Sequence, residues 1–304
     1  MARTLDRNYI LGILLVLLAT MGWSLAGMFV RLLPELDGWQ INCWRSLFTS
    51  LFLLLYLMTL YGRDWQLRFR SLPTAALLAG AGFFAVGSTL YVTSLTLTST
   101  ANVSCIGAMS PLFVAAVSGL VLRERPHLAI WMAAFTALFG VTLIFHDGLE
   151  RGNWPGSAVA ILVALCFAGQ TVTLRRYRNF DMIPAICLGG FLAFVTAGLF
   201  GGGLSVAPSD VVVLAIMGPV QLAIPLVLFA RSARYIQAAT LSLIALLDAV
   251  LNPFWAWLGA GEIPTLYAVI GGGIILIAVA MSIIAGQRAA YASRAPAKLS
   301  TTAD

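Results

Sequence analysis

Two stretches of the chain, "SLTLTSTANVSCIGAMSPLFVAAVSGLVLRERP" at residues 94–126 and "SARYIQAATLSLIALLDAVLNPFWAWLGAGEIP" at residues 232–264, align without a gap at a shift of 138 residues. Seven of the 33 aligned positions are identical, and Glu124 meets Glu262. Apolar stretches match easily by chance, so the shared positions of an acid and a proline carry more weight than the number of identical residues. In both copies an apolar segment ends at an acid two residues before a proline that begins the next segment. The two stretches therefore indicate a duplicated unit.

The composition places this unit in a membrane. Of the 304 residues, 60% are hydrophobic and 10% are charged, and the mean hydropathy is +0.93, whereas soluble domains have about 25% charged residues. A membrane-crossing helix needs about 20 consecutive apolar residues, and lipid leaves helices as the preferred way to satisfy the backbone. We therefore predict an all-α integral membrane protein with ten transmembrane helices. The ten apolar segments cover residues 9–30, 39–61, 72–95, 99–121, 127–145, 154–175, 183–202, 210–230, 236–258 and 264–286.

The first segment has an alternative interpretation as a cleaved signal peptide. Arg3 and Arg7 precede its apolar run, and residues 24–26 resemble a signal-peptidase site. The apolar run continues to Val30, which is longer than the core of a usual signal peptide. This length favours a membrane span.

The basic residues predict the orientation. If the N-terminus is cytoplasmic, 15 of the 18 lysines and arginines lie in cytoplasmic regions, while Arg31 and Arg151 lie in outside turns and Arg45 lies within a span. This bias predicts a multi-pass protein of the inner cell membrane with both termini in the cytoplasm. The dispersion of arginines over loops also explains the isoelectric point of about 9.5 without a nucleic-acid partner.

The duplication predicts how the two units are arranged. A unit with five spans must enter the membrane from the side opposite to its copy, so the units form an inverted repeat. The first unit covers residues 10–145 and the second covers residues 154–286, and the tail at 287–304 is expected to be disordered and cytoplasmic. Glu124 and Glu262 then lie on opposite faces, as structural residues at the ends of helices 4 and 9.

These features resemble a known family. The stretch "ANVSCIGAMSPLFVAAVSGLVLRERP" at residues 101–126 and the second "GEIP" at residues 261–264 are similar to the ends of helices 4 and 9 in EamA-type transporters of the drug/metabolite transporter superfamily. The resemblance covers residues 10–286 and implies ten helices in an inverted repeat. It also implies a central cavity lined mainly by helices 1, 3, 4, 6, 8 and 9, and transport of small organic solutes, often as export.

The chain departs from the family pattern in helix 9. The family tends to have Glu-Pro there, whereas this chain has Asp248-Ala249 and its proline follows at Pro253. This departure predicts that the break in helix 9 is displaced toward Pro253. In the first unit, Pro111 marks the corresponding break.

Asp248 is the acid that lies within a span, where it aligns with Ser110. One interpretation is structural: a nearby proline frees backbone carbonyls at membrane depth, and Asp248 caps this irregularity or bonds to neighbouring helices. The other is functional, because an acid at the bilayer centre costs about 2.5–3.5 kcal/mol on insertion scales and is a candidate for binding or coupling. Its apolar sequence neighbours favour the neutral form unless a cation approaches.

Other polar and aromatic residues within the spans are candidate substrate contacts. Arg45 either snorkels toward the nearer face, which is the simpler interpretation, or pairs with a carboxylate of the protein or the substrate. Gln221 lies near two prolines that leave unpaired backbone around it. Trp23 and Tyr91 are suited to stacking on a flat or cationic substrate, or serve in packing. The remaining candidates, which otherwise make interhelical hydrogen bonds, are Asn102, Ser104, Gln170, Thr240 and Ser242.

The leading functional prediction is a secondary transporter that moves a small organic metabolite, amino-acid-like or a vitamin or drug, by alternating access. The family resemblance favours export, and uptake of a vitamin or nucleotide-like metabolite is the alternative. The rival from another class is an integral-membrane enzyme or sensor. Against it, the interiors of the spans hold one acid and one arginine and no histidine near midspan, and the loops are too short for a signalling domain.

The expected partners are the small-molecule substrate and the lipid bilayer, and the oligomeric state, a homodimer included, is left open. We expect no cofactor, since the chain lacks the GxxxxGK[ST] pattern of an ATP-binding loop. We also expect no metal site, because the cysteines show no CxxC spacing and the two histidines have no ligand-spaced partner. The cysteines are Cys43, Cys105, Cys166 and Cys187.

Overall fold

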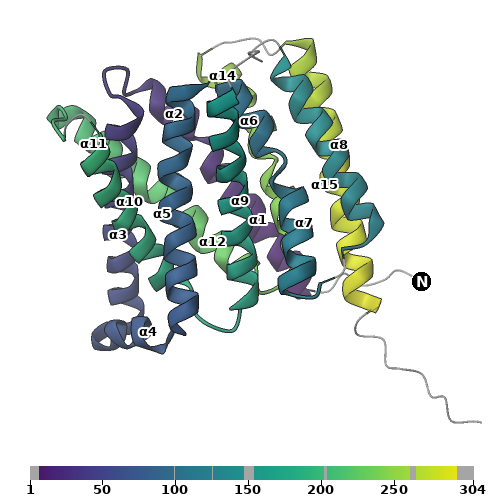
Figure 1. Ribbon diagram of the computed structural model, residues 1–304, viewed down its shortest axis with the longest axis horizontal. Helices are drawn as coiled ribbons and strands as arrows, with labels where there is room; N and C mark the ends of the chain where they lie inside the picture. Colours follow the sequence, from purple (N-terminus) through teal and green to yellow (C-terminus); the bar gives the residue numbers. More distant parts are fainter. Residues whose placement is uncertain are drawn as a thin grey trace, which may run out of the picture.

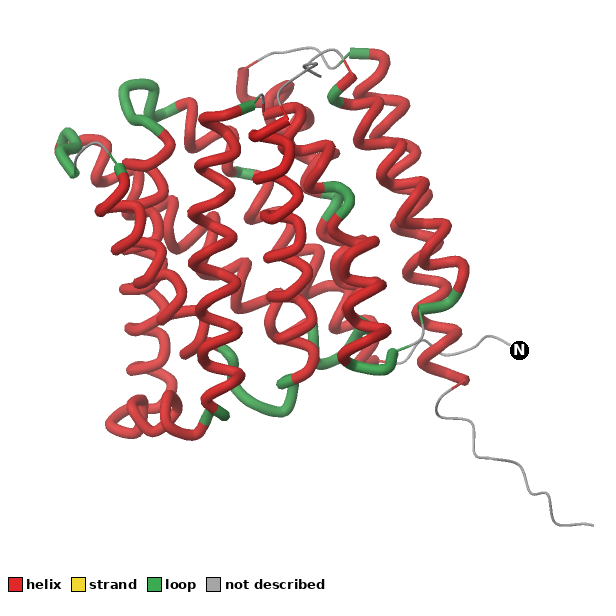
Figure 2. The backbone as a smooth tube through the Cα atoms, viewed as in Figure 1, coloured by secondary structure: helices red, strands yellow, loops and turns green. Residues whose placement is uncertain are grey.

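A computed structural model of the protein describes residues 7–98, 100–124, 126–146, 154–201, 204–260 and 265–292. Over these ranges the regular structure is helical, and long helices run side by side between two faces of the molecule (Figure 1 and Figure 2). In chain order the elements are α1 (Arg7–Ser24), α2 (Ala26–Arg31), α3 (Gly38–Tyr61), the 3₁₀ turn η1 (Gly62–Asp64), α4 (Trp65–Ser71), α5 (Thr74–Leu97), α6 (Thr100–Gly107), α7 (Ser110–Val121), α8 (Leu128–Ile144), α9 (Trp154–Arg176), α10 (Ile183–Phe200), α11 (Pro208–Met217), the π-helical turn η3 (Gly218–Ala223), α12 (Ile224–Ser232), α13 (Ala238–Ala245), α14 (Asp248–Ala260) and α15 (Leu266–Ala292).

Apolar helical segments occupy the positions of the ten predicted spans. Within the described residues, eight helical segments are long and apolar enough to cross a membrane. Two shorter apolar helical segments, Leu128–Ile144 and Ala238–Asn252, complete the ten predicted segments. The predicted all-α membrane fold is therefore confirmed.

The two faces of the helical bundle carry different numbers of charges. The face at which α1 begins, here called the N-terminal face, also holds the ends of α3, α9 and α12 and is the lower side in Figure 1. The opposite face, where α2 ends and α3 begins, holds Arg31. Arginines gather at the N-terminal face, among them Arg7, Arg63, Arg68, Arg70, Arg175, Arg176, Arg178, Arg231 and Arg234.

The two halves of the chain are interleaved. The most extensive helix contacts join one half to the other: α8 packs against α15, α3 against α10, α5 against α9, and α1 against α12. These contacts obey an exchange of equivalent helices: α5 on α9 is the image of α12 on α1, α6 on α9 is the image of α13 on α1, and α7 on α9 is the image of α14 on α1. This pairing is the one expected of an inverted repeat with a pseudo-two-fold axis. The residue boundaries of the two units stay a prediction.

The closest approach between the halves uses glycine. A Cβ atom added to Gly140 of α8 would lie 2.8 Å from the carbonyl oxygen of Gly271 of α15, and Gly271 meets the Gly140 carbonyl in the same way. In lipid no hydrophobic driving force brings helices together, so their association depends on close van der Waals packing, which small residues allow. The fifth helices of the two halves are therefore packed backbone against backbone.

The fourth and ninth predicted spans, which form α6–α7 and α13–α14, are both broken at mid-depth. The predicted displacement of the second break is wrong. The first break lies at residues 108–109, between α6 and α7, and the second lies at residues 246–247, between α13 and α14. These positions differ by the same 138 residues as the repeated sequence. Pro253 lies inside α14. At both breaks the backbone makes i→i+3 hydrogen bonds, such as Leu247 N to Ile244 O at 3.1 Å, so the tightened turn forms without a proline at the aligned position.

The eighth predicted span, which forms α11, η3 and α12, is irregular where two prolines interrupt its backbone hydrogen bonding. Pro219 lies in η3 and Pro225 opens α12, and each lacks the N–H that an α-helix uses. The chain widens into a π-helical turn that holds Gln221. Such turns are rare and often occur at functional sites.

Two segments differ from the sequence prediction. The disordered tail was expected from residue 287, but α15 continues to Ala292, so the prediction is wrong for residues 287–292; residues 293–304 lie outside the described chain. The helix α4 lies at the N-terminal face in a segment predicted as a loop. Its residues Trp65 and Phe69 pack against the core while Arg68 and Arg70 are exposed, an amphipathic pattern too short to be recognised as a span.

Glu124 links helices that are distant in sequence. It lies beyond the end of α7, and its carboxylate accepts a hydrogen bond from Nε of Arg175 on α9 at 2.8 Å. Arg175 also donates to the carbonyl of Ala233, after α12, at 2.9 Å. Glu124 therefore links the ends of α7, α9 and α12 at the N-terminal face. Glu262, its counterpart in the repeat, lies outside the described residues.

Replacing Glu124 with glutamine is expected to lower the stability of the protein by about 1.5–3 kcal/mol, because a charge-assisted hydrogen bond is lost. The two side chains are only 10% and 19% exposed, so solvent does not compensate fully. Folded yield after purification should fall more than substrate affinity. Asp64→Asn removes an exposed acid at the same face and serves as the control. A Glu124→Gln protein with normal yield and abolished binding would reverse this assignment.

Candidate functional site

A cavity of about 590 Å³ lies between the two halves, toward the opposite face. Its walls come from α1 and α2, the first turns of α3, the second half of α5, the middle of α9, the η3–α12 segment and the first residue of α14. Leu36 and Leu95 line it where it approaches the opposite face. Its polar lining includes Asn42, Arg45, Ser88, Tyr91, Gln170, Gln221 and Asp248.

The position of Arg45 follows from the start of α3. Asp37 precedes this helix, and its carboxylate accepts a hydrogen bond from the backbone N–H of Gln40 at 2.7 Å, while the Gln40 side chain accepts one from the backbone N–H of Asp37 at 3.1 Å. This reciprocal pair satisfies two free donors and sets where the helix begins. Arg45 then lies about two turns inside, at the depth of the cavity, with Asn42 one turn before it on the same side.

Arg45 is held by neutral side chains from two elements, α3 and η3. Its Nη2 donates to Oδ1 of Asn42 at 3.1 Å, and its Nη1 donates to Oε1 of Gln221 at 3.4 Å. Ser88 of α5 donates to the same Asn42 oxygen at 2.7 Å. Within the described residues no carboxylate lies at ion-pair distance from Arg45. The guanidinium therefore faces the cavity in place of snorkelling to a face, and its charge has no fixed counter-ion.

Asp248 lines the same cavity and is the first residue of α14. Its Oδ1 accepts a hydrogen bond from Nδ2 of Asn252, one turn later, at 3.0 Å. The same amide lies 3.0 Å from the Asp248 carbonyl. Tyr91 on α5 lines the same cavity as Asp248 and Arg45. Asp248 thus combines a local bond in the broken helix with a place in the cavity wall.

Several buried polar atoms around the cavity have no hydrogen-bond partner in the protein. Gln170 is 6% exposed, and neither its amide nitrogen nor its oxygen is bonded. The same is true of Nδ2 of Asn42 and Nε of Arg45. Because buried polar groups are normally paired, these atoms are available to hydrogen-bond a solute in the cavity.

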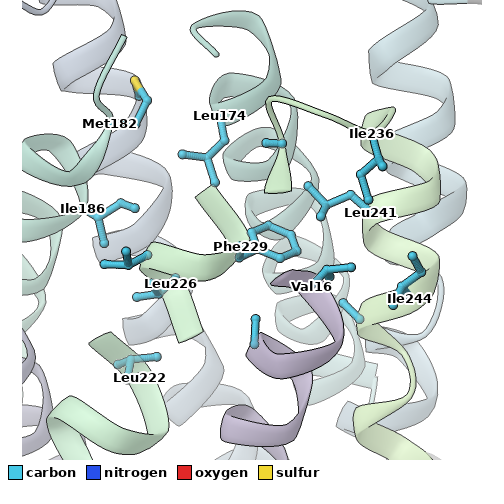
Figure 3. Packing of buried hydrophobic residues seen from close by; sticks show 14 of the residues in the cluster. Val16, Leu174, Met182, Ile186, Leu222, Leu226, Phe229, Ile236, Leu241 and Ile244 are labelled. Carbon is cyan, nitrogen blue, oxygen red and sulfur yellow. The ribbon is translucent and has the colours of Figure 1, made fainter. Parts of the chain in front are cut away.

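Aromatic rings close the cavity toward the N-terminal face. Phe229 of α12 is buried, and its ring centroid lies 5.0 Å from that of Trp23 and 5.8 Å from that of Phe167. Figure 3 shows Phe229 among Val16, Leu174 and other buried apolar side chains. The cavity is therefore separated from the N-terminal face by a layer of buried apolar side chains, here called the apolar layer.

The structure gathers six of the predicted contacts in this cavity and places four elsewhere. Those in the cavity are Trp23, Arg45, Tyr91, Gln170, Gln221 and Asp248. Asn102 donates to Oγ1 of Thr98 at 2.9 Å, and Ser242 donates to the carbonyl of Ala239 at 2.9 Å. Thr240 is fully buried in α13, and Ser104 lies half-buried on α6. Asn102 and Ser104 lie on α6, nearer the opposite face, whereas Thr240 and Ser242 lie on α13, nearer the N-terminal face, and none of the four lines the cavity.

Sequence reasoning missed Asn42, which accepts a hydrogen bond from Arg45, and Ser88, which donates to the same Asn42 oxygen. Asn42 stands three residues before Arg45, a spacing that places both on one side of a helix, and this signal was present in the sequence. Ser88 lies among small residues of α5 with no pattern to distinguish it. Pro111 is buried at the second position of α7, where its missing N–H costs no helical hydrogen bond.

The fold and the cavity define a class of protein. Two inverted, interleaved halves with broken helices at mid-depth and a polar cavity between them are the architecture of a membrane transporter. A family model agrees: the EamA-like transporter family matches residues 10–146 and 154–284. The chain belongs to this family and is a multi-pass membrane protein.

Individual similar proteins are distant. The chain is 25% identical over 257 residues to the "Uncharacterized transporter YdfC" of Bacillus subtilis (strain 168), an alignment that covers 81% of this chain and 83% of that protein. It is 26% identical over 191 residues to the "Pseudopaline exporter CntI" of Pseudomonas aeruginosa (strain UCBPP-PA14), covering 59% and 64% respectively. A crystal structure with 16% sequence identity superposes with a TM-score of 0.80 over 91% of this chain and 98% of the other, which supports the fold.

Proposed function

We propose that the protein is a secondary transporter for a small amino-acid-like metabolite that carries both a cationic and an anionic group. The observation that carries this proposal is the pair of charged residues in one cavity. Arg45 and Asp248 line the same space of about 590 Å³, and neither has an ion-pair partner among the described residues. Charged groups at membrane depth are costly, so a solute with complementary charges is stabilised between them.

The hydrogen-bonding groups and rings support a solute of this kind. A guanidinium is suited to bind a carboxylate through two parallel hydrogen bonds, while Asp248 accepts from an ammonium group. Gln170 offers a free donor and acceptor at the same depth. Trp23 and Tyr91 present aromatic surface to the solute's apolar part. The cavity therefore favours a zwitterion with an apolar or aromatic side chain over a sugar or a simple ion.

Export from the cytoplasm is the direction we propose. The arginines of the N-terminal face favour a cytoplasmic position for it in the inner cell membrane. A protein named as an exporter is 26% identical to the chain over 191 residues. The cavity extends toward the opposite face, where an exporter releases its solute, and the apolar layer closes the path from the cytoplasm.

The experiment that tests this function is transport by the purified full chain in liposomes. A panel of radiolabelled amino acids, their decarboxylated amines and neutral sugars should be tested with imposed proton gradients of both signs. We expect at least one amino acid to move faster than in protein-free liposomes, and the sugars to show no difference. If every member of the panel moved at the protein-free rate under both gradients, the proposed substrate class would be excluded.

The proposed orientation predicts the result of reporter fusions. Reporters fused after Gly62, Arg178 and Arg288 should report a cytoplasmic position. Reporters fused after Asp37, Gly152 and Glu262 should report the far side of the membrane, because each span carries the chain to the other side. A consistent external signal after Arg178 would rule out ten spans with cytoplasmic termini.

A further inference from the structure

A second cavity, of about 340 Å³, lies at the N-terminal face and shares no lining residue with the first. We call it the arginine cavity, because Arg178, Arg231 and Arg234 line it. Its walls are the end of α9, the chain from Phe180 to the start of α10, the end of α12 and the first half of α1. The end of α3 completes it.

The repeat relates the walls of the two cavities. Exchanging each helix for its counterpart in the other half turns α1–α2 into α9, α3 into α10, α5 into α11–α12, and α9 into α1. Applied to the first cavity, this exchange converts the end of α2, the start of α3 and the end of α5 into the end of α9, the start of α10 and the end of α12. Those three segments line the arginine cavity. The two cavities are therefore equivalent spaces at opposite faces.

Both cavities end at the apolar layer. Leu174 and Met182 line the arginine cavity, Leu226 and Phe229 line the first cavity, and all four belong to one cluster of buried apolar residues. In an inverted-repeat transporter the halves rock around a central site, so that equivalent spaces open in turn. The arginine cavity therefore occupies the position of the solute path on the N-terminal side.

Over the described ranges, the positive charges of the arginines in this cavity are not neutralised by a neighbouring carboxylate. Arg231 donates to the hydroxyl of Tyr56 and Arg234 donates to the carbonyl of Phe180 at 3.3 Å, and both acceptors are neutral. Within the described chain none of the three arginines lies at ion-pair distance from a carboxylate.

Asp181 is the acid that lines the same cavity, and its oxygens are already occupied. Oδ2 accepts from the hydroxyl of Tyr61 at 2.7 Å, and Oδ1 accepts from the backbone N–H of Ile183 at 3.1 Å. Three positive groups thus meet one negative group that is turned to other partners. An anion entering the cavity meets a net positive charge.

We propose that the arginine cavity is a binding site for the anionic group, carboxylate or phosphate, of the solute on the N-terminal side. This inference rests on the proposed transport function. It adds a second point of recognition, before or after the central site, that favours solutes with a free acid group. An anionic phospholipid headgroup offers the same chemistry, but the equivalence to the first cavity favours the solute.

The test uses inorganic phosphate as the probe, with the purified full chain in phosphatidylcholine nanodiscs. Binding is measured by phosphorus NMR line broadening. We expect saturable binding, and a loss of affinity of about tenfold or more in Arg178→Gln/Arg234→Gln, because two charge-assisted contacts are removed. The matched control is Arg63→Gln/Arg70→Gln, which removes the same charge from the same face outside the cavity; all four arginines are exposed, so the two double variants differ in whether the charge lines the cavity. Equal losses in both double variants would overturn the site, since only general surface charge would then act.

Two further measurements separate the solute from a lipid and this inference from the proposed function. Native mass spectrometry should show equal retention of phosphatidylglycerol by wild type and by the Arg178→Gln/Arg234→Gln protein; selective loss in the variant would assign the cavity to lipid. In transport, that variant should raise KM for an acidic or zwitterionic solute about tenfold with little change in kcat, which also excludes a folding defect. Wild-type transport without any phosphate binding would overturn the inference and leave the proposed function standing.

Discussion

Asp248→Asn should abolish the response of transport to a pH gradient, while substrate binding should be weakened but still measurable, because the asparagine carbonyl still accepts a hydrogen bond from the ammonium group of the solute. Asparagine keeps the shape of the side chain and its bond to Asn252 but cannot gain or lose a proton. Burial disfavours a charged carboxylate, whereas exposure to water in the open cavity favours it. If Asp248 releases its proton when the cavity opens and takes it up when the cavity closes, proton movement is tied to the exchange of the two halves.

The measurement is uptake into proteoliposomes at several imposed pH gradients, together with protection of the protein by substrate against thermal unfolding. Among the described residues, Tyr91, Arg45 and Cys166 are the other titratable side chains that line the cavity, and all three are retained. Asp210→Asn, at the start of α11 and outside the cavity, is the matched control and should behave as wild type. If Asp248→Asn transported at the wild-type rate with unchanged pH dependence, the coupling role would be excluded. Asp248 would then have only the structural role of capping the break between α13 and α14.

Arg45→Gln should weaken binding of a carboxylate-bearing solute by roughly 10- to 100-fold. The guanidinium contributes charge-assisted hydrogen bonds, each worth about 1.5–3 kcal/mol, and tenfold in affinity corresponds to about 1.4 kcal/mol. Glutamine can still hydrogen-bond to Asn42, so the fold should be preserved. Arg45→Lys keeps the charge but not the planar fork that contacts Asn42 and Gln221, and we expect an intermediate loss.

The decisive comparison is between an amino acid and its decarboxylated amine. The loss in Arg45→Gln should be confined to the amino acid, because the amine has no carboxylate to pair. Ser88→Ala, which removes one hydrogen bond to Asn42 without changing charge, is the control and should affect both solutes slightly. Equal losses for the two solutes would show that Arg45 supports the cavity wall and does not contact the carboxylate.

The backbone architecture could be predicted from the sequence to a large extent. Ten apolar segments, the arginine bias and the shift of 138 residues are properties of the chain itself, because span length and repeat order are written along one dimension. The same shift relates the two breaks, at residues 108–109 and 246–247, whereas the prediction for the second break followed Pro253 and was wrong. Proline was the misleading signal here: a tightened turn at residues 246–247 forms without it, and Pro253 is accommodated within α14.

Membership of the cavity depended on three-dimensional packing. Gln170 and Ser242 are both polar residues in apolar helices, yet Gln170 faces the cavity and Ser242 bonds to its own helix. In a soluble protein the polar face of a helix would reveal which side is buried. In a membrane, lipid is as apolar as the protein interior, so helices such as α5 and α9 are apolar on all sides and the periodicity does not identify the inner side. Only the contacts between the interleaved halves turned Asn42, Arg45 and Asp248 toward one space.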